Sequence, residues 1–166
     1  MTGVQTCALP IFENEKFSSQ FQLKLIGKVS QEILETISAF NLNSYINNLG
    51  YVSHKEAVEH QKKSQVLLLI EIDSTETKSI IPGKLFEYMV SERPIIAIGP
   101  KGSDFAEIIT TTNTGVFFTY DEKLRLKNQI LSYFELFLTE KLTVSPVGLQ
   151  QYSRKNLTEK LSKIIG

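Results

Sequence analysis

Residues 78–100, which read KSIIPGKLFEYMVSERPIIAIGP, bring together residue types that can hold a phosphate and a sugar. The pattern predicts a loop that ends in a Pro-Gly pair, followed at once by a short helix over residues 83–92. The N–H groups of Gly83 and Lys84 would lie at the start of that helix, where the helix dipole favours an anion. Because Lys78 and Lys84 add positive charge, we expect an anion to bind here.

Glu87 places a carboxylate about one turn into that helix, between Phe86 and Tyr88. A carboxylate can accept hydrogen bonds from both hydroxyls of a vicinal diol, the arrangement that ribose offers. We expect this helix to be mostly buried, and a buried acid needs a partner. Two structural explanations compete with a ligand: an ion pair with Lys84 at helical spacing, or a place on the solvent-facing side.

Apolar strands and amphipathic helices alternate along the rest of the chain, with short loops between them. The predicted strands lie within residues 21–29, 45–52, 65–72, 94–98 and 115–120. The predicted helices cover residues 31–40, 54–63, 83–92, 104–111, a long stretch from residue 121 and a last one from about residue 152. This alternation predicts an α/β fold with a Rossmann-like open parallel sheet and helices on both faces.

Local patterns predict where the helices begin and which sides they bury. Ser53 with Glu56, and Asp104 with Glu107, have the spacing of capping boxes. The long helix carries an apolar stripe formed by Leu124, Leu126, Ile130, Leu131, Phe134 and Leu138. The last helix carries a second stripe, formed by Leu157, Leu161, Ile164 and Ile165.

The loops at the carboxyl ends of the strands are the expected place for a ligand, since open parallel sheets bind ligands there. Four predicted loops leave such ends, at residues 27–28, 52–54, 73–84 and 99–104. The loop at residues 73–84 is the longest and runs directly into the helix of Glu87. We therefore expect the ligand beside this loop.

Charge and composition argue against several classes of partner. Lysine plus arginine equals aspartate plus glutamate, at 18 each, so no net charge attracts nucleic acid or an anionic membrane. The two histidines and the single cysteine, Cys7, make a zinc site improbable. Because no apolar run reaches the roughly 20 residues of a membrane span, we expect a soluble, cytoplasmic protein.

The two ends of the chain are set apart from a central domain. Residues 1–11, MTGVQTCALPI, look like the translation of a sequencing-library adapter, so we exclude them as non-native. Residues 12–148 have the size of one domain, and residues 149–166 form a last helix after a turn segment. The adapter-like start also suggests that an upstream part of the gene is missing.

Residues 82–100 and the later DFAEII and TNTGVFF segments resemble the donor-binding domain of retaining GT-B glycosyltransferases, a family with many bacterial polysaccharide and lipid-glycan enzymes. The order of elements from Leu23 onward also fits that domain, which is the C-terminal half of the GT-B fold. The resemblance implies a hexosyltransferase that moves a sugar from a nucleotide diphosphate to an acceptor hydroxyl. No metal or other cofactor is expected, because the chain has no Asp-x-Asp motif.

The resemblance also implies roles for the residues of a donor site. Glu87 would hold the ribose hydroxyls, while Gly83 and Lys84, with Lys78 nearby, would lie by the diphosphate and the donor sugar. The family often has a second acid eight positions before that glutamate, in contact with the sugar, where this chain has Ser79. The base of the nucleotide would be enclosed by residues of two earlier loops: Gly27, Tyr51 and Val52.

The family's acceptor-binding domain, and the first strand and helix of its donor domain, have no counterpart in this sequence. We expect both in a missing N-terminal part that supplies the catalytic residues, so this chain alone should be inactive. The full enzyme could then associate peripherally with a membrane. Two alternatives stay open: a sugar-nucleotide epimerase of similar two-domain build, and a non-catalytic α/β nucleotide-binding or interaction module in which Glu87 is structural.

Overall fold

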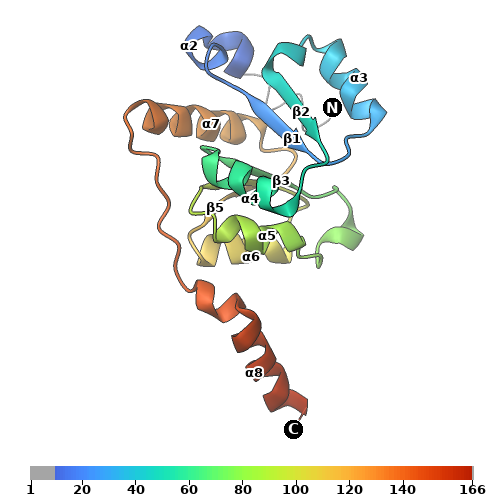
Figure 1. The fold of residues 1–166 in the computed structure, drawn as a ribbon, viewed down its shortest axis with the longest axis vertical. Coiled ribbons are helices and arrows are strands. Elements are labelled where there is room, and N and C mark those ends of the chain that lie inside the picture. Colours follow the sequence, from blue (N-terminus) through green and yellow to red (C-terminus); the bar gives the residue numbers. More distant parts are fainter. Residues whose placement is uncertain (1–9, 166) are drawn as a thin grey trace. The chain divides into compact units, whose positions relative to one another are not determined.

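The chain folds as two compact units, each with its own strands and its own apolar core. One unit comprises Met1–His60 with Asp121–Leu142, and the other comprises Gln61–Tyr120 with Thr143–Gly166. The structure is a computed structural model that describes residues 10–165, and Figure 1 shows its elements in sequence colours. Neighbouring strands run parallel in both units and alternate with helices, so the predicted α/β class is confirmed.

The first unit is built on β1 (Leu23–Ile26) and β2 (Ile46–Gly50), which pair in parallel. Its helices include α2 (Glu15–Ser18), α3 (Gln31–Ala39) and α7 (Lys123–Leu138). Its core contains the buried side chains of Ile11, Phe17, Ile37 and Leu42. The ring of Phe17 meets Phe134 of α7 edge-on at 5.1 Å, and this contact joins the two stretches of sequence that make up the unit.

The second unit holds a sheet of β3 (Leu67–Ile70), β4 (Ile95–Ile98) and β5 (Gly115–Phe118), with β4 in the middle. Its helices are α5 (Gly83–Met89), α6 (Asp104–Thr111) and α8 (Arg154–Ile165), while α4 (His54–Lys63) crosses from the first unit into the second. All four residues of β4 are buried, as expected of a central parallel strand covered on both faces. Leu85 and Met89 of α5 share one core cluster with Phe105 of α6.

The strands form two sheets, whereas the sequence predicts a single open one. Within residues 10–165, β1 pairs with β2 alone, and β3 pairs with β4 alone. Strand-helix alternation identifies the elements and their parallel direction, but hydrogen bonding between distant segments decides which strands are neighbours. The prediction of parallel strands is therefore confirmed. The prediction of a single sheet is corrected to one sheet of two strands and one of three.

Helix α4 begins as its capping box predicts. The Ser53 N–H donates to Glu56 Oε2 at 2.8 Å, and the Glu56 N–H donates to Ser53 Oγ at 3.2 Å. The second predicted box is wrong, because Asp104 is already the first helical residue of α6 and Ser103 occupies the capping position. The Ser103 hydroxyl turns back to the Pro100 carbonyl at 2.6 Å, so it caps no helix N–H.

Helix α5 is shorter than predicted, ending at Met89 instead of residue 92. The Ser91 hydroxyl and N–H both donate to the Tyr88 carbonyl, at 2.6 and 3.1 Å. Glu92 then adopts a left-handed conformation with a φ of 59°, which no α-helix continues. The serine and the turn after it end the helix early.

Two predicted apolar stripes are wrong in part. Leu124 is 69% exposed, because α7 begins only at Lys123 and turns Leu126 into the core instead. The last helix is divided into a 3₁₀ turn, η3 (Leu149–Tyr152), and α8. Within α8, which the structure describes in full, no residue of the predicted stripe is buried.

Residues 1–9, including Cys7, lie outside the described part of the chain, so their adapter-like origin stays a prediction. Pro10 and Ile11 are described, and both are buried. Ile11 packs in the core of the first unit with Phe17. The boundaries predicted at residues 11 and 148 stay predictions as well.

Candidate functional site

The ends of three strands are tied together at one edge of the second unit's sheet. Beyond β3, the Glu71 N–H donates to the Ile98 carbonyl at 2.9 Å, and beyond β4 the Gly99 N–H donates to the Phe118 carbonyl at 3.1 Å. The Tyr120 hydroxyl, two residues after β5, donates to the Glu71 carbonyl at 2.6 Å. This contact links the exits of β5 and β3, so the carboxyl edge of the sheet has a defined shape.

The environment of Tyr120 favours its neutral form. Burial raises the pKa of its phenol, and the carboxylates of Asp73 and Glu71 raise it further. The hydroxyl therefore keeps its proton at neutral pH and remains the donor to the Glu71 carbonyl.

Hydrogen bonds hold the loop between β3 and α5 at two places, one within the loop and one to α6. The Thr77 hydroxyl lies 2.7 Å from the Ile72 carbonyl and 2.9 Å from the Ser74 carbonyl, which closes a short 3₁₀ turn, η2 (Thr75–Thr77). Further along, the Asp104 N–H at the start of α6 donates to the Lys78 carbonyl at 2.9 Å. The half-buried Lys78 and the exposed Ser79 are thereby placed beside the first turn of α6.

The start of α5 leaves two backbone donors without a protein acceptor. The Leu85 N–H donates to the Pro82 carbonyl at 2.9 Å. Within residues 10–165, the N–H groups of Gly83 and Lys84 donate to no other protein atom. A Cβ added at Gly83 would have nothing within 4 Å, so open space lies in front of these donors.

Glu87 lies on the exposed side of α5, contrary to the expectation of a mostly buried helix. Leu85 and Met89 anchor α5 in the core at a spacing of four residues, and the residue midway between them faces away. Within residues 10–165, Glu87 forms no ion pair with Lys84. Its Oε2 instead accepts a hydrogen bond from Gln61 Nε2 of α4 at 3.3 Å.

The predicted site residues fall in both units. Five of them lie in the second unit, on the loop after β3 and on α5: Lys78, Ser79, Gly83, Lys84 and Glu87. Three lie in the first unit, where β1 and β2 end: Gly27, Tyr51 and Val52. The Gly27 N–H donates to the Gly50 carbonyl at 2.7 Å, and its φ of 106° requires glycine, while the Tyr51 side chain is 84% exposed. The first five are close along the sequence and lie in the same unit, whereas the other three belong to the other unit.

Sequence reasoning missed two residues near the candidate site: Gln61, which contacts Glu87, and Tyr120, which contacts the exit of β3. Gln61 carries no local signal, because its partner Glu87 lies 26 positions further along the chain. Tyr120 ends a predicted strand, so the rule that ligands bind beyond the carboxyl ends of strands could have found it. Applying that rule also to the loop after the fifth predicted strand would have identified Tyr120.

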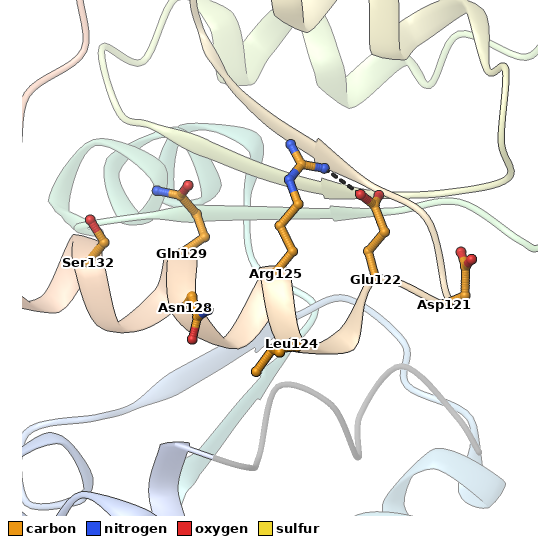
Figure 2. Close-up of a pocket in the computed structure, with 7 residues that line it drawn as sticks. All are labelled: Asp121, Glu122, Leu124, Arg125, Asn128, Gln129 and Ser132. Atoms are coloured by element: carbon orange, nitrogen blue, oxygen red, sulfur yellow. Dashed lines mark hydrogen bonds and ion pairs between the residues drawn. The ribbon is translucent and has the colours of Figure 1, made fainter.

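A separate hollow of about 640 Å³ lies along the first turns of α7, in the first unit (Figure 2). Its lining comes from this helix and the turn before it: Asp121, Glu122, Leu124, Arg125, Asn128, Gln129 and Ser132. Arg125 Nη1 pairs with Glu122 Oε1 at 2.7 Å across the upper side in the view. The hollow is the open flank of one helix and includes none of the predicted site residues.

The candidate site consists of the loop between β3 and α5 and of α5 itself. Among residues 10–165, no group of three or more His, Cys, Asp or Glu side chains is placed to hold a metal ion. None of the described helices has the length and apolar character needed to cross a membrane. No protein-family model matches the chain, and no curated protein matches it. The candidate site therefore rests on the chemistry and placement of its own residues.

Proposed function

We propose that this chain is the donor-binding part of a retaining GT-B glycosyltransferase and that it binds a nucleotide-diphosphate sugar at α5. The observation that carries the proposal is the single exposed face shared by Gly83, Lys84 and Glu87, which are three and four residues apart. Within the described residues 10–165, the two N–H groups on this face have no protein acceptor, and an ammonium group lies beside them with a carboxylate one turn away. One helical turn is about 5.4 Å, a span comparable to that between a diphosphate and its ribose diol.

Each group has a distinct task in this proposal. The Gly83 and Lys84 N–H groups hold a phosphate oxygen, and the Lys84 ammonium balances the charge that builds up as the diphosphate leaves. The Glu87 carboxylate accepts hydrogen bonds from the ribose hydroxyls. Sugar transfer to an acceptor hydroxyl then requires an acceptor-binding domain, so the chain alone is expected to bind the donor without turnover. The proposal also includes a cytoplasmic location, which cell fractionation tests.

Calorimetric titration of the chain with uridine, guanosine and adenosine diphosphates tests the site. Removing a charged hydrogen-bond acceptor costs about 1.5–3 kcal/mol, so Glu87→Gln should weaken binding of the preferred nucleotide by roughly 10–100-fold. The 2′-deoxy form of that nucleotide should bind the wild type more weakly than the ribose form does. The Glu87→Gln variant should bind the 2′-deoxy form no more weakly than the ribose form. Glu107→Gln, at an exposed acid of α6 in the same unit, is the matched control. Equal binding by wild type and Glu87→Gln contradicts the proposal.

One observation favours the alternative of a non-catalytic module, in which Glu87 is structural. The hydrogen bond from Gln61 makes Glu87 a link between α4 and α5 within the second unit. In that case Glu87→Gln and Gln61→Ala should both lower the melting temperature slightly and leave nucleotide affinity unchanged. Thermal unfolding measured beside the titration separates the two functions.

A further inference from the structure

We infer that Gln61 is a positioning residue that sets the preference of the site for nucleotides with an intact ribose diol. The inference rests on the proposed binding of a nucleotide at α5, and it assigns part of that recognition to a side chain from another helix. Gln61 is half-buried in the last turn of α4, and its Nε2 donates to Glu87 Oε2 at 3.3 Å. Both residues belong to the second unit.

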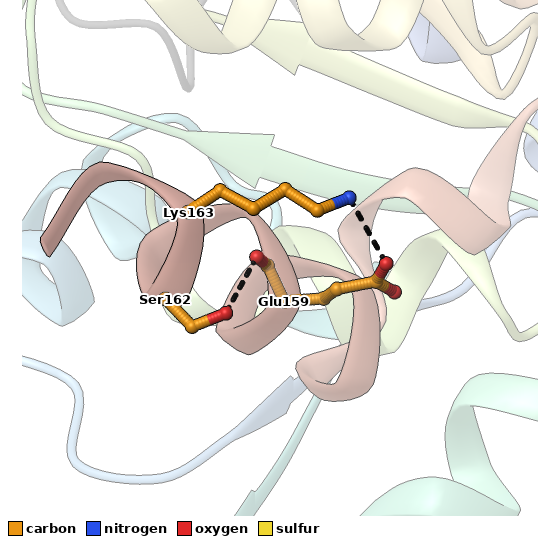
Figure 3. A network of polar contacts seen from close by, with 3 residues as sticks. All are labelled: Glu159, Ser162 and Lys163. Atoms are coloured by element: carbon orange, nitrogen blue, oxygen red, sulfur yellow. Dashed lines mark hydrogen bonds and ion pairs between the residues drawn. The ribbon is translucent and has the colours of Figure 1, made fainter. Parts of the chain in front are cut away.

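The partner of Glu87 is neutral, so the carboxylate keeps its charge. Exposed acids can pair with a cation of their own helix, as Figure 3 shows for Lys163 Nζ and Glu159 Oε1, which lie 3.1 Å apart on α8. Lys84 stands three residues before Glu87 on α5, yet the two form no ion pair within residues 10–165. The ammonium group of Lys84 is therefore left for a phosphate, and the carboxylate is left for hydroxyl donors.

The hydrogen bond from Gln61 leaves room for a diol on the same carboxylate. An ionised carboxylate accepts at about four lone-pair positions on its two oxygens, and Gln61 uses one of them, on Oε2. The remaining positions can accept from both hydroxyls of a ribose. Because a carboxylate only accepts, the amide atom of Gln61 that faces it must be the nitrogen. The bond can thus persist in the complex and need not break when the nucleotide binds.

Gln61 fixes a side chain that would otherwise move. A glutamate on an exposed helix face samples several rotamers and loses that freedom when a ligand binds. The backbones on both sides of the bond are held, since α5 is anchored in the core and Arg93 Nε, near the start of β4, donates to the Lys62 carbonyl at the end of α4, at 2.9 Å. The amide therefore restricts Glu87 before the nucleotide arrives, which strengthens binding by preorganisation.

Calorimetric titration of the full chain tests the inference with two ligands. One is whichever of uridine, guanosine and adenosine diphosphate the wild type binds most tightly, and the other is its 2′,3′-dideoxy form. Gln61→Met keeps the length of the side chain but removes the donor, so it should weaken binding of the ribose form roughly 3–10-fold and leave the dideoxy form unchanged. When Glu87→Gln is already present, Gln61→Met should weaken binding no further.

Two further variants sharpen the result. Gln61→Glu puts a second carboxylate beside Glu87, and the repulsion between like charges should reduce the preference for the ribose form at least as much as Gln61→Met does. Gln65→Met makes the same chemical change at an exposed glutamine of the same unit and should leave both affinities unchanged.

A merely structural role of Gln61 gives a different result. Gln61→Met would then weaken both forms by the same factor, or lower the melting temperature alone, and either outcome overturns the inference. Weaker binding by Glu87→Gln but not by Gln61→Met overturns the inference and leaves the proposed function standing. No binding of any of the three diphosphates by the wild type overturns the proposed function and this inference with it.

Discussion

The two sheets of this protein share a parallel strand-helix pattern but bury their strands to different extents. Every residue of β4 in the three-stranded sheet is buried. Within β1 and β2, both described in full, every residue is half-buried or exposed. The difference follows from neighbours, because β4 has a hydrogen-bonded strand on each side and β1 and β2 have one each. Most of the packing energy that a sheet can supply is therefore concentrated around β4.

The largest destabilisation by a single substitution is expected at the contact between β4 and β5. Gly115 lies opposite Ile95, and a Cβ added at Gly115 would fall 2.0 Å from the Ile95 carbonyl oxygen. Because that oxygen belongs to the backbone, Gly115→Ala must separate the two strands. We expect a cost above about 4 kcal/mol and loss of the second unit's cooperative unfolding transition.

Hydrogen exchange followed by mass spectrometry checks this expectation unit by unit. In Gly115→Ala, peptides from β3, β4 and β5 should lose protection, while peptides from β1 and β2 keep theirs. Gly83→Ala is the control, since a Cβ there meets nothing within 4 Å. Full protection of β4 in Gly115→Ala would show that the two strands can move apart without breaking the sheet.

A matched pair of isoleucines measures the difference between the sheets directly. Ile95 of β4 is 0% exposed, and Ile46 of β2 is half-buried. Ile95→Ala should cost about 3 kcal/mol through lost burial and a cavity, whereas Ile46→Ala should cost about 1 kcal/mol. Chemical denaturation monitored by circular dichroism gives both values, and equal costs would remove the distinction between the sheets.

Buried polar groups extend the comparison to hydrogen bonds. The Thr112 hydroxyl donates to the Ile108 carbonyl at 2.6 Å, so the buried Thr114 hydroxyl, 2.9 Å away, must donate to Thr112. Thr112→Val should cost about 1–3 kcal/mol, because it leaves the Thr114 hydroxyl buried without an acceptor. The double variant Thr112→Val/Thr114→Val should cost less than the sum of the single ones, as a double-mutant cycle would show.

Much of the local structure was predictable from sequence because its causes are local. Ser53 and Glu56 predict the first residue of α4, and its predicted end at residue 63 also agrees with the structure. The β-branched run at residues 94–98 predicts β4, which covers Ile95–Ile98. The loop and helix that carry Lys78, Ser79, Gly83, Lys84 and Glu87 were located in the same way.

The remaining features depend on contacts between distant residues. Strand patterns cannot show that β1 and β3 belong to different sheets, because pairing joins segments far apart in sequence. The exposure of Glu87 follows from the anchoring of Leu85 and Met89 in a core that includes β4 and α6. Its bond with Gln61 depends on how α4 and α5 pack, which neither helix encodes alone.

The smallest effect is expected at the capping box of α4. Its hydrogen bonds are exposed, whereas those of Thr112 and Thr114 are buried. The hydrogen bonds from the Ser53 hydroxyl and N–H hold the pKa of Glu56 below its ordinary value, with a smaller contribution from His60. Since the folded pKa is the lower one, the ionised carboxylate stabilises the helix start above the unfolded pKa, and this stability is lost as pH falls through the folded pKa. Ser53→Ala should cost about 1 kcal/mol at neutral pH. Hydrogen exchange of α4 between neutral and acidic pH should show protection falling in the wild type but not in Glu56→Gln, and an identical pH dependence in both would contradict the role of Glu56.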